Sequence, residues 1–221
     1  MVVAPSLSVT PVVVPLVFAS EVVSPTVSEA VVDGKYSTKV YLNTLEEAWE
    51  DYTSRSKRTF VDHQRFCYHI PFTRMAQKAH ERLLRHVHAE ENTFETQVEK
   101  GLLYARKMGN AYTAALYIGL ISLLENDQED LSDARIGFFS YGSGCVGEFF
   151  SAKVNKGYKN HLHTQAHTDL FEKRVMLSYE QYSEFFSYQL PTDGSEANTP
   201  RQTNGRFKLL GIKNHERLYG E

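Results

Sequence analysis

Residues 111–124, AYTAALYIGLISLL, form a run that is apolar nearly all round. The chain has an ordinary water-soluble composition, with 42% hydrophobic and 23% charged residues. In such a chain a helix without a polar stripe must be buried on every side. The run therefore predicts a central helix with other layers packed around it. Asn110 stands just before the run and is a candidate N-cap, because its side chain accepts hydrogen bonds from free main-chain N–H groups.

Two runs of strand-forming residues follow the central helix, and small residues separate them. We expect strands at residues 135–140 (RIGFFS) and 146–154 (VGEFFSAKV), with a tight turn at residues 141–144 (YGSG). This pattern is typical of a hairpin whose apex exposes main-chain amides. Its small side chains let a ligand approach closely.

Helical spacing and turn residues mark the rest of the chain. Further elements are expected as helices at residues 42–54, 72–88, 162–173 and 178–188, and as a strand at residues 207–212. Pro71 stands where the first turn of a helix tolerates proline, and residues 191–204 are a loop by composition. Helical and strand-like blocks alternate from Ala30 onward, which predicts a single mixed α/β unit.

The amino-terminal stretch, residues 1–28, has a different composition. It is rich in Val, Pro and Ser and contains no Lys or Arg, whereas a secretory signal begins with positive charge. Its apolar run, residues 12–19, is too short to span a bilayer and is interrupted by Pro15. We expect residues 1–28 to be a poorly ordered segment without membrane contact, or in part an edge strand, and residues 29–221 to form the functional domain.

Charge and cysteine content exclude several classes of protein. A formal net charge of −3 provides no basic field for nucleic acid or an anionic membrane, so any anion site must be a local cluster. The two cysteines, Cys67 and Cys145, form no C-x-x-C pair and therefore indicate neither a disulfide framework nor a zinc knuckle. We expect two free thiols and a reducing, cytoplasmic location.

One local cluster of positive charge lies on the helix expected at residues 72–88. Arg74, Lys78, Arg82 and Arg85 follow one another at intervals of four, four and three, which stacks them along one stripe beside the apolar face. The stripe is either a site for a phosphate-bearing ligand or a solvated basic face, partly neutralised by Glu81.

Cys67 and His69 lie just before this helix. The positive end of the helix dipole favours a neutral His69 ring, which can donate a hydrogen bond to a carbonyl. Side chains two residues apart share a face of an extended segment, so a Cys67–His69 pair is possible. The alternatives are a structural histidine and a buried structural thiol.

Two further groups are candidates for chemistry. His161, His163 and His167, with Asp169 close by, have spacing that zinc ligands use, but no Cys or Glu pair completes a tetrahedral set, and we predict no metal. The turn around Ser143 joins two strands and is not a nucleophile elbow, so Ser143 is a better hydrogen-bond donor than nucleophile.

Four ordered blocks closely resemble the hydroxymethylglutaryl-CoA synthase family: Val32–Ser37 (VDGKYS), Tyr68–Lys78 (YHIPFTRMAQK), Gly109–Thr113 (GNAYT) and Ile136–Gly144 (IGFFSYGSG). The resemblance runs from about Ala30 to the tail His215-x-Arg217-x-Tyr219, and Val146–Phe150 is bacterial in style. It implies the carboxy-terminal half of a thiolase-like α/β fold.

The resemblance also implies a reaction and a set of roles. The family condenses acetyl-CoA with acetoacetyl-CoA: a cysteine takes the acetyl group, a glutamate removes a methyl proton, the enolate attacks the ketone, and water releases the product. The implied roles are catalytic polarisation of the acetoacetyl carbonyl for His69, acyl contact for Asn110 and Ser143, and binding of the CoA arm for Ser37, Arg74 and Lys78. CoA thioesters are substrates here, and no cofactor is implied.

This sequence departs from the family pattern in places. Arg74 replaces a lysine more usual in some relatives and keeps the charge, and Ala115 stands where many relatives carry a serine. The family's cysteine nucleophile and glutamate base lie in an amino-terminal half that residues 1–28 do not resemble, and neither Cys67 nor Cys145 lies in the nucleophile's motif.

Two hypotheses follow from that departure. The chain is either a fragment or split-gene product that needs a partner half, or a non-catalytic module that binds CoA thioesters or regulates. The implied partners are acetyl-CoA and acetoacetyl-CoA or acyl carrier protein, with the amino-terminal half or a second copy of the chain. The implied pathways are mevalonate synthesis and polyketide β-branching.

Overall fold

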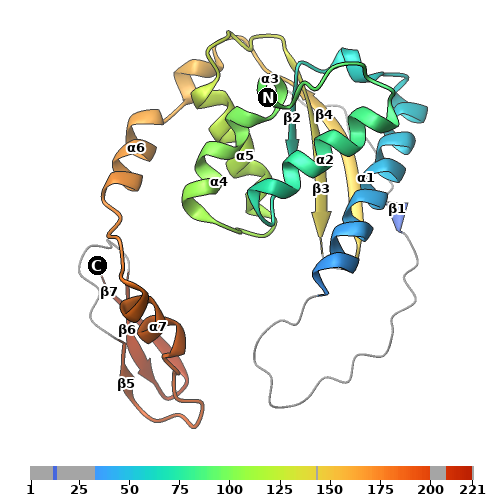
Figure 1. The fold of residues 1–221 in the computed structure, drawn as a ribbon. Coiled ribbons are helices and arrows are strands. Elements are labelled where there is room, and N and C mark those ends of the chain that lie inside the picture. The colour runs from blue at the N-terminus through green and yellow to red at the C-terminus, as the bar shows by residue number, and fades with distance from the viewer. Residues whose placement is uncertain (1–11, 14–32, 143, 200–207, 221) are drawn as a thin grey trace, which may run out of the picture. The chain divides into compact units, whose positions relative to one another are not determined.

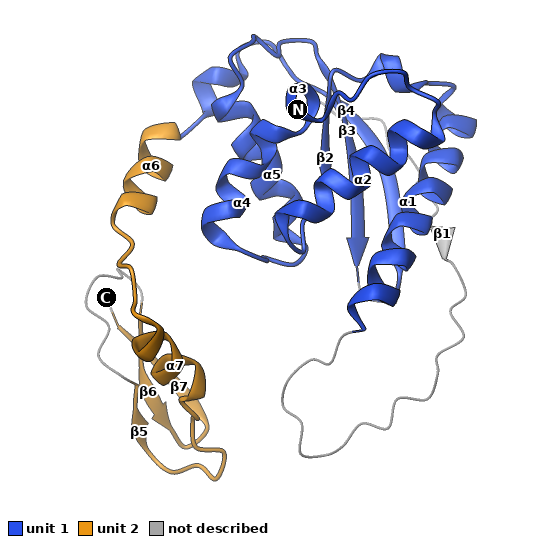
Figure 2. Ribbon diagram, in the orientation of Figure 1, with its two compact units in different colours: residues 1–163 blue, residues 164–221 orange. Residues whose placement is uncertain are grey.

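The structure is a computed structural model that describes residues 12–13, 33–142, 144–199 and 208–220 (Figure 1). Its residue contacts divide the chain into two compact units, Met1–His163 and Thr164–Glu221 (Figure 2). The sequence predicted a single unit from the unbroken alternation of helices and strands. That alternation continues across the boundary, so it does not show where packing contacts become few.

Unit 1 contains a four-stranded sheet in the order β1-β4-β3-β2, built from β1 (Val12–Val13), β2 (Arg65–Tyr68), β3 (Arg135–Gly142) and β4 (Val146–Lys153). Strand β2 runs parallel to β3, and β3 and β4 are antiparallel, with Phe138 opposite Phe150. The predicted hairpin is confirmed. Strand β1 pairs with the outer edge of β4; the rest of residues 1–28, expected to be poorly ordered, lies outside the described residues.

The helices of unit 1 are α1 (Gly34–Ser56), α2 (Thr73–His86), α3 (Phe94–Gln97), α4 (Leu103–Met108) and α5 (Ala114–Asn126), with short 3₁₀ turns η1 (Phe60–Asp62), η2 (Glu99–Leu102) and η3 (Tyr158–His161). Helix α1 begins earlier than the predicted residue 42, because the Asp33 carboxylate accepts hydrogen bonds from the main-chain N–H groups of Lys35 and Tyr36. Helix α2 begins after the N-cap Phe72, so Pro71 precedes the helix.

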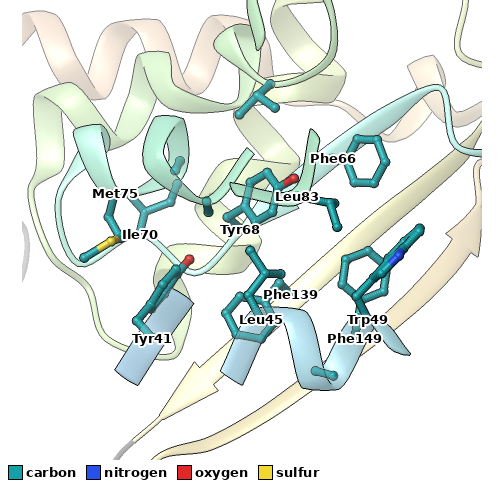
Figure 3. Packing of buried hydrophobic residues seen from close by; sticks show 14 of the residues in the cluster. Tyr41, Leu45, Trp49, Phe66, Tyr68, Ile70, Met75, Leu83, Phe139 and Phe149 are labelled. Carbon is teal, nitrogen blue, oxygen red and sulfur yellow. The ribbon is translucent and has the colours of Figure 1, made fainter. Parts of the chain in front are cut away.

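Helices α1 and α2 pack on one face of the sheet (Figure 3). The cluster they build is aromatic, with Tyr41, Leu45 and Trp49 of α1 against Phe139 and Phe149 of the hairpin. The Tyr41 and Phe139 rings meet edge to face at 5.2 Å, and those of Trp49 and Phe149 at 4.8 Å. This cluster determines the position of α1 on the sheet.

Gly147 of β4 lies where α1 crosses the strand. A Cβ atom at this position would overlap the side-chain methyl of Thr44, and it would also press on the Phe139 ring. Only glycine allows the helix to approach the strand this closely.

Helix α5 packs on the other face, where Leu116 and Leu123 join Cys67, Ile136 and Phe138 in a second cluster. The prediction that this helix is buried on every side is wrong: Tyr117 is 56% exposed and Ile121, one turn later, is 39% exposed. This side of the helix is therefore partly open to solvent. No helix in the described ranges is long and apolar enough to cross a membrane.

The predicted start of α5 is also wrong. Tyr112 has a left-handed backbone with φ of +50°, so a helix cannot continue through it. The Asn110 side chain accepts a hydrogen bond from the Tyr112 N–H at 2.8 Å, which closes a turn rather than capping the helix, and Thr113 is the N-cap.

Unit 2 consists of helices α6 (Thr164–Glu172) and α7 (Tyr179–Ser187) and a three-stranded antiparallel sheet of β5 (Ala197–Asn198), β6 (Lys208–Lys213) and β7 (Glu216–Gly220). The predicted helices are confirmed, and the strand predicted at residues 207–212 is β6; β7, which follows it, was not predicted. Asn214 and His215 both have positive φ, which suits the tight turn between β6 and β7. Neither α6 nor α7 buries a residue.

Candidate functional site

His69 lies where the parallel strands β2 and β3 reach their carboxyl ends. It follows the last residue of β2, and its N–H donates to the Phe139 carbonyl of β3 at 2.8 Å. Ligands of open α/β sheets bind at this end of the strands. The structure therefore places the histidine singled out from the sequence at the edge where a substrate is expected.

The His69 side chain is buried, and its burial lowers its pKa. This direction agrees with the predicted neutral ring, and its cause is removal of the ring from water. Its ring lies 6.2 Å from that of Tyr141, which in turn packs against Tyr41 at 5.1 Å. A neutral imidazole keeps one ring N–H, which can donate a hydrogen bond to a carbonyl.

Cys67 is a structural thiol. It is buried among the second cluster, and burial raises its pKa to about 12, which leaves it protonated and unreactive near neutral pH. Within the described residues no hydrogen bond joins it to His69. Of the two alternatives, the buried thiol is the one the structure supports.

The basic stripe of α2 divides into two parts. Arg82 makes a two-pronged ion pair with Glu46 of α1, at 2.7 Å for each contact. Glu81 accepts a hydrogen bond from Gln77 and makes no ion pair with the stripe among the described residues. Within the described part of the chain, Arg74, Lys78 and Arg85 have no carboxylate partner within 4.0 Å, which leaves three positive charges for an anion.

Ser37, Asn110 and Ser143 complete the set predicted from the sequence. Ser37 is exposed, one turn before Tyr41 on α1, so it lies on the side of the helix that faces the His69 segment. Asn110 is exposed in the turn that precedes α5. Ser143 lies outside the described residues.

Of the three histidines considered as metal ligands, His161 and His163 lie in unit 1 and His167 lies in unit 2. No group of three His, Cys, Asp or Glu side chains in the described ranges is arranged to hold a metal ion. The main-chain N–H of His163 donates to the Glu125 carboxylate at 3.0 Å.

Tyr41 and Tyr141 were missed by the sequence reasoning. The Tyr41 hydroxyl donates to the His69 carbonyl at 2.9 Å, and burial is the main cause that raises the pKa of Tyr141, followed by hydrogen bonding with the Cys145 thiol. Part of the signal was present. Tyr141 lies in a block that resembles the family, but the sequence predicted a turn there, and Tyr41 stands just before the helix predicted at residues 42–54.

The sequence profile of the family described as "Hydroxymethylglutaryl-coenzyme A synthase C terminal" matches residues 85–202, more than half of the chain. The chain belongs to the hydroxymethylglutaryl-CoA synthase family. It is 38% identical, over 189 residues, to a hydroxymethylglutaryl-CoA synthase of Enterococcus faecalis, an alignment that covers 85% of this chain and 49% of that protein.

Solved structures of hydroxymethylglutaryl-CoA synthases have the same fold. A crystal structure of such a synthase complexed with CoA matches with a TM-score of 0.78 and 34% identity, over 90% of this chain and 52% of that one. The synthase of the curacin biosynthetic pathway, in complex with a holo donor acyl carrier protein, matches with a TM-score of 0.78 and 26% identity, over 88% and 52%. The fold is thiolase-like, and the chain spans about half the length of the relatives it matches.

Proposed function

We propose that this chain supplies the part of a 3-hydroxy-3-methylglutaryl thioester synthase that binds the acetoacetyl group and the CoA arm. The observation that carries the proposal is His69, buried and held at the carboxyl ends of β2 and β3, with its pKa lowered by burial. The family to which the chain belongs supports the reaction class.

In this proposal His69 acts on the ketone of the acetoacetyl thioester. Its neutral ring donates a hydrogen bond to the ketone oxygen, where negative charge develops as the enolate carbon adds to the carbonyl carbon. A donor already in place costs no rearrangement when that charge appears. The Asn110 amide and the Ser143 hydroxyl are proposed to contact the same acyl group.

The unpaired cations of α2 are proposed to bind the phosphates of the thioester. Arg74 and Lys78 lack carboxylate partners within the described residues, and charge-assisted contacts to phosphate are the strong kind. Ser37 is assigned to the same arm. Relatives include one solved with CoA and one solved with an acyl carrier protein, and both carriers present a phosphopantetheine arm.

The amino-terminal half of a synthase is proposed to cover the exposed side of α5. Tyr117 and Ile121 leave an apolar strip on a helix whose other side is fully buried. Since Cys67 is unreactive, the nucleophile and base are proposed to come from the amino-terminal half of a synthase, and the strip is the surface that this half would cover.

The deciding experiment is a condensation assay with acetyl-CoA and acetoacetyl-CoA on this chain, with and without a separately expressed amino-terminal half of a close relative. We expect activity only in the mixture. His69→Asn should abolish that activity, and His88→Asn, at an exposed histidine just beyond α2, should leave it intact. Repeating the assay with acetoacetyl-acyl carrier protein distinguishes the two carriers.

If the mixture shows no condensation while the chain still binds CoA by calorimetry, the catalytic role is overturned and a non-catalytic CoA-binding module remains. Condensation by the chain alone would contradict the proposed need for a partner half.

A further inference from the structure

The main chain of His69 has two hydrogen-bond partners, and only one is a strand. Its N–H continues the ladder to β3 by donating to the Phe139 carbonyl at 2.8 Å. In a continued parallel ladder, its carbonyl would accept from the next free N–H of β3. Strand β2 ends at Tyr68, and this carbonyl accepts instead from the Tyr41 hydroxyl of α1 at 2.9 Å.

Among the described residues, no main-chain N–H takes the place of that hydroxyl. Pro71 has no N–H, and α2 begins only at Thr73. A buried carbonyl without a donor is costly, so the Tyr41 hydroxyl determines where the chain turns between β2 and α2.

Tyr41 itself is fixed in place. It is 1% exposed, and its ring meets those of Phe139 at 5.2 Å and Tyr141 at 5.1 Å. Figure 3 shows its ring rising from α1 within the cluster, beside Ile70 and Met75. Burial raises the pKa of the hydroxyl well above 10, so it remains a donor at every physiological pH.

The ring of His69 is held differently from those of the other buried histidines. Both ring nitrogens of His63 and of His80 are hydrogen-bonded, to Tyr52 and the Thr59 carbonyl and to Tyr68 and Thr93 respectively. Among the described residues none bonds to the ring nitrogens of His69. Its direction is therefore set through its main chain and by packing against Tyr141.

We propose that Tyr41 is a positioning residue for His69, whose hydroxyl holds the His69 main chain so that the imidazole meets the acetoacetyl carbonyl. The inference rests on the function proposed above. It assigns no contact with substrate to Tyr41, which acts through the histidine.

Tyr41→Phe tests this, with Tyr52→Phe as the matched control. Tyr52 is also a buried tyrosine of α1, and its hydroxyl bonds to His63 and Ser151 at 2.8 Å. Both variants lose a buried hydroxyl and keep the ring, so circular dichroism should show both folded.

The first readout is NMR titration of the histidine rings in the full chain, with His69 assigned from His69→Asn. Tyr41→Phe should raise the pKa of His69 toward its ordinary value, because a released segment becomes more hydrated, and Tyr52→Phe should leave it unchanged. An unchanged His69 titration in Tyr41→Phe, or equal shifts in both variants, would overturn the proposal.

The second readout is kinetic, in the mixture with the amino-terminal half. Tyr41→Phe should slow condensation about ten-fold while acetyl transfer to the partner's cysteine changes by less than about two-fold, since His69 serves only the acetoacetyl group. Equal loss of both steps would indicate general damage and contradict positioning. If the wild-type mixture is silent, the proposed function fails, while the titration still decides whether Tyr41 holds His69.

Discussion

Units 1 and 2 use similar apolar residues in opposite ways. Unit 1 buries its aromatic side chains between two helices and a sheet, and also between that sheet and α5. In unit 2, α7 displays Tyr179, Tyr182 and Phe186 to solvent, and Met176 just before it is 92% exposed. Hydrophobic composition therefore does not show where a core forms; unit 1 has a core of its own, and the helices of unit 2 contribute to none within the described residues.

The largest expected effect tests the core of unit 1. Phe139→Ala should lower the free energy of unfolding by about 3–5 kcal/mol, because it leaves a cavity beneath Tyr41. The chain's one tryptophan, Trp49, is buried in unit 1, so its fluorescence during denaturant unfolding reports this unit. Phe186→Ala in α7 should change the midpoint of denaturant unfolding little. If both variants lost a similar amount of stability, the contrast between the core of unit 1 and the exposed helix of unit 2 would be refuted.

The next effect compares ion pairs. Arg65 and Asp127 pair at 2.6 Å with side chains only 10% and 5% exposed. Asp127→Asn should cost about 3 kcal/mol of unfolding free energy, since it weakens the pairing of a buried guanidinium. The exposed pair of Lys213 and Glu196 in unit 2 is the control, and Glu196→Gln should cost less than about 0.5 kcal/mol in thermal unfolding. Equal losses of unfolding free energy in the two variants would contradict the expected effect of burial on these ion pairs.

The pH dependence of stability should also follow unit 1. Burial lowers the pKa of His80 from 6.5 to about 4, so the unfolded chain takes up this proton at a higher pH than the folded one. Stability is therefore full above pH 6.5 and falls as the pH drops toward 4, by up to about 3 kcal/mol. His80→Gln should flatten the profile followed by Trp49 fluorescence. An unaltered slope would show that other groups dominate.

The smallest effect concerns binding. Lys78→Ala should weaken CoA binding by about 1 kcal/mol through lost phosphate contact, measured by calorimetry. Lys213→Ala removes a lysine from unit 2 and should leave the affinity unchanged. Equal weakening by both would point to a diffuse charge effect rather than a site on α2.

Much of the fold could be predicted because its signals are local. The hairpin from Arg135 to Lys153 follows from alternating aromatic residues around a small-residue turn. The exposed side of α5 could not be predicted from the helix itself, because a run of apolar residues has the same sequence pattern whether one side or every side of the helix is buried. The start of that helix was missed because a single left-handed residue, Tyr112, stops it.

The residues of the candidate site could be predicted from the sequence, but the contacts that hold them in place could not. His69, Arg74 and Lys78 stand in blocks that resemble a family, so each could be named from the sequence. The bond from the Tyr41 hydroxyl to the His69 carbonyl joins residues on different elements and follows no period. Long-range contacts between a side chain and the main chain become visible only once helix and strand are placed together.

Gly147 is a sensitive position that the proposed substrate contacts do not include. A hydrogen atom is the only side chain that fits beneath Thr44, so this position sets the height of α1 above the sheet. The same helix carries Tyr41 to His69. A larger side chain at residue 147 would push α1 away from the sheet and shift Tyr41 and the His69 segment with it. A screen for inactive variants would therefore recover this glycine of β4 alongside the residues proposed to touch substrate.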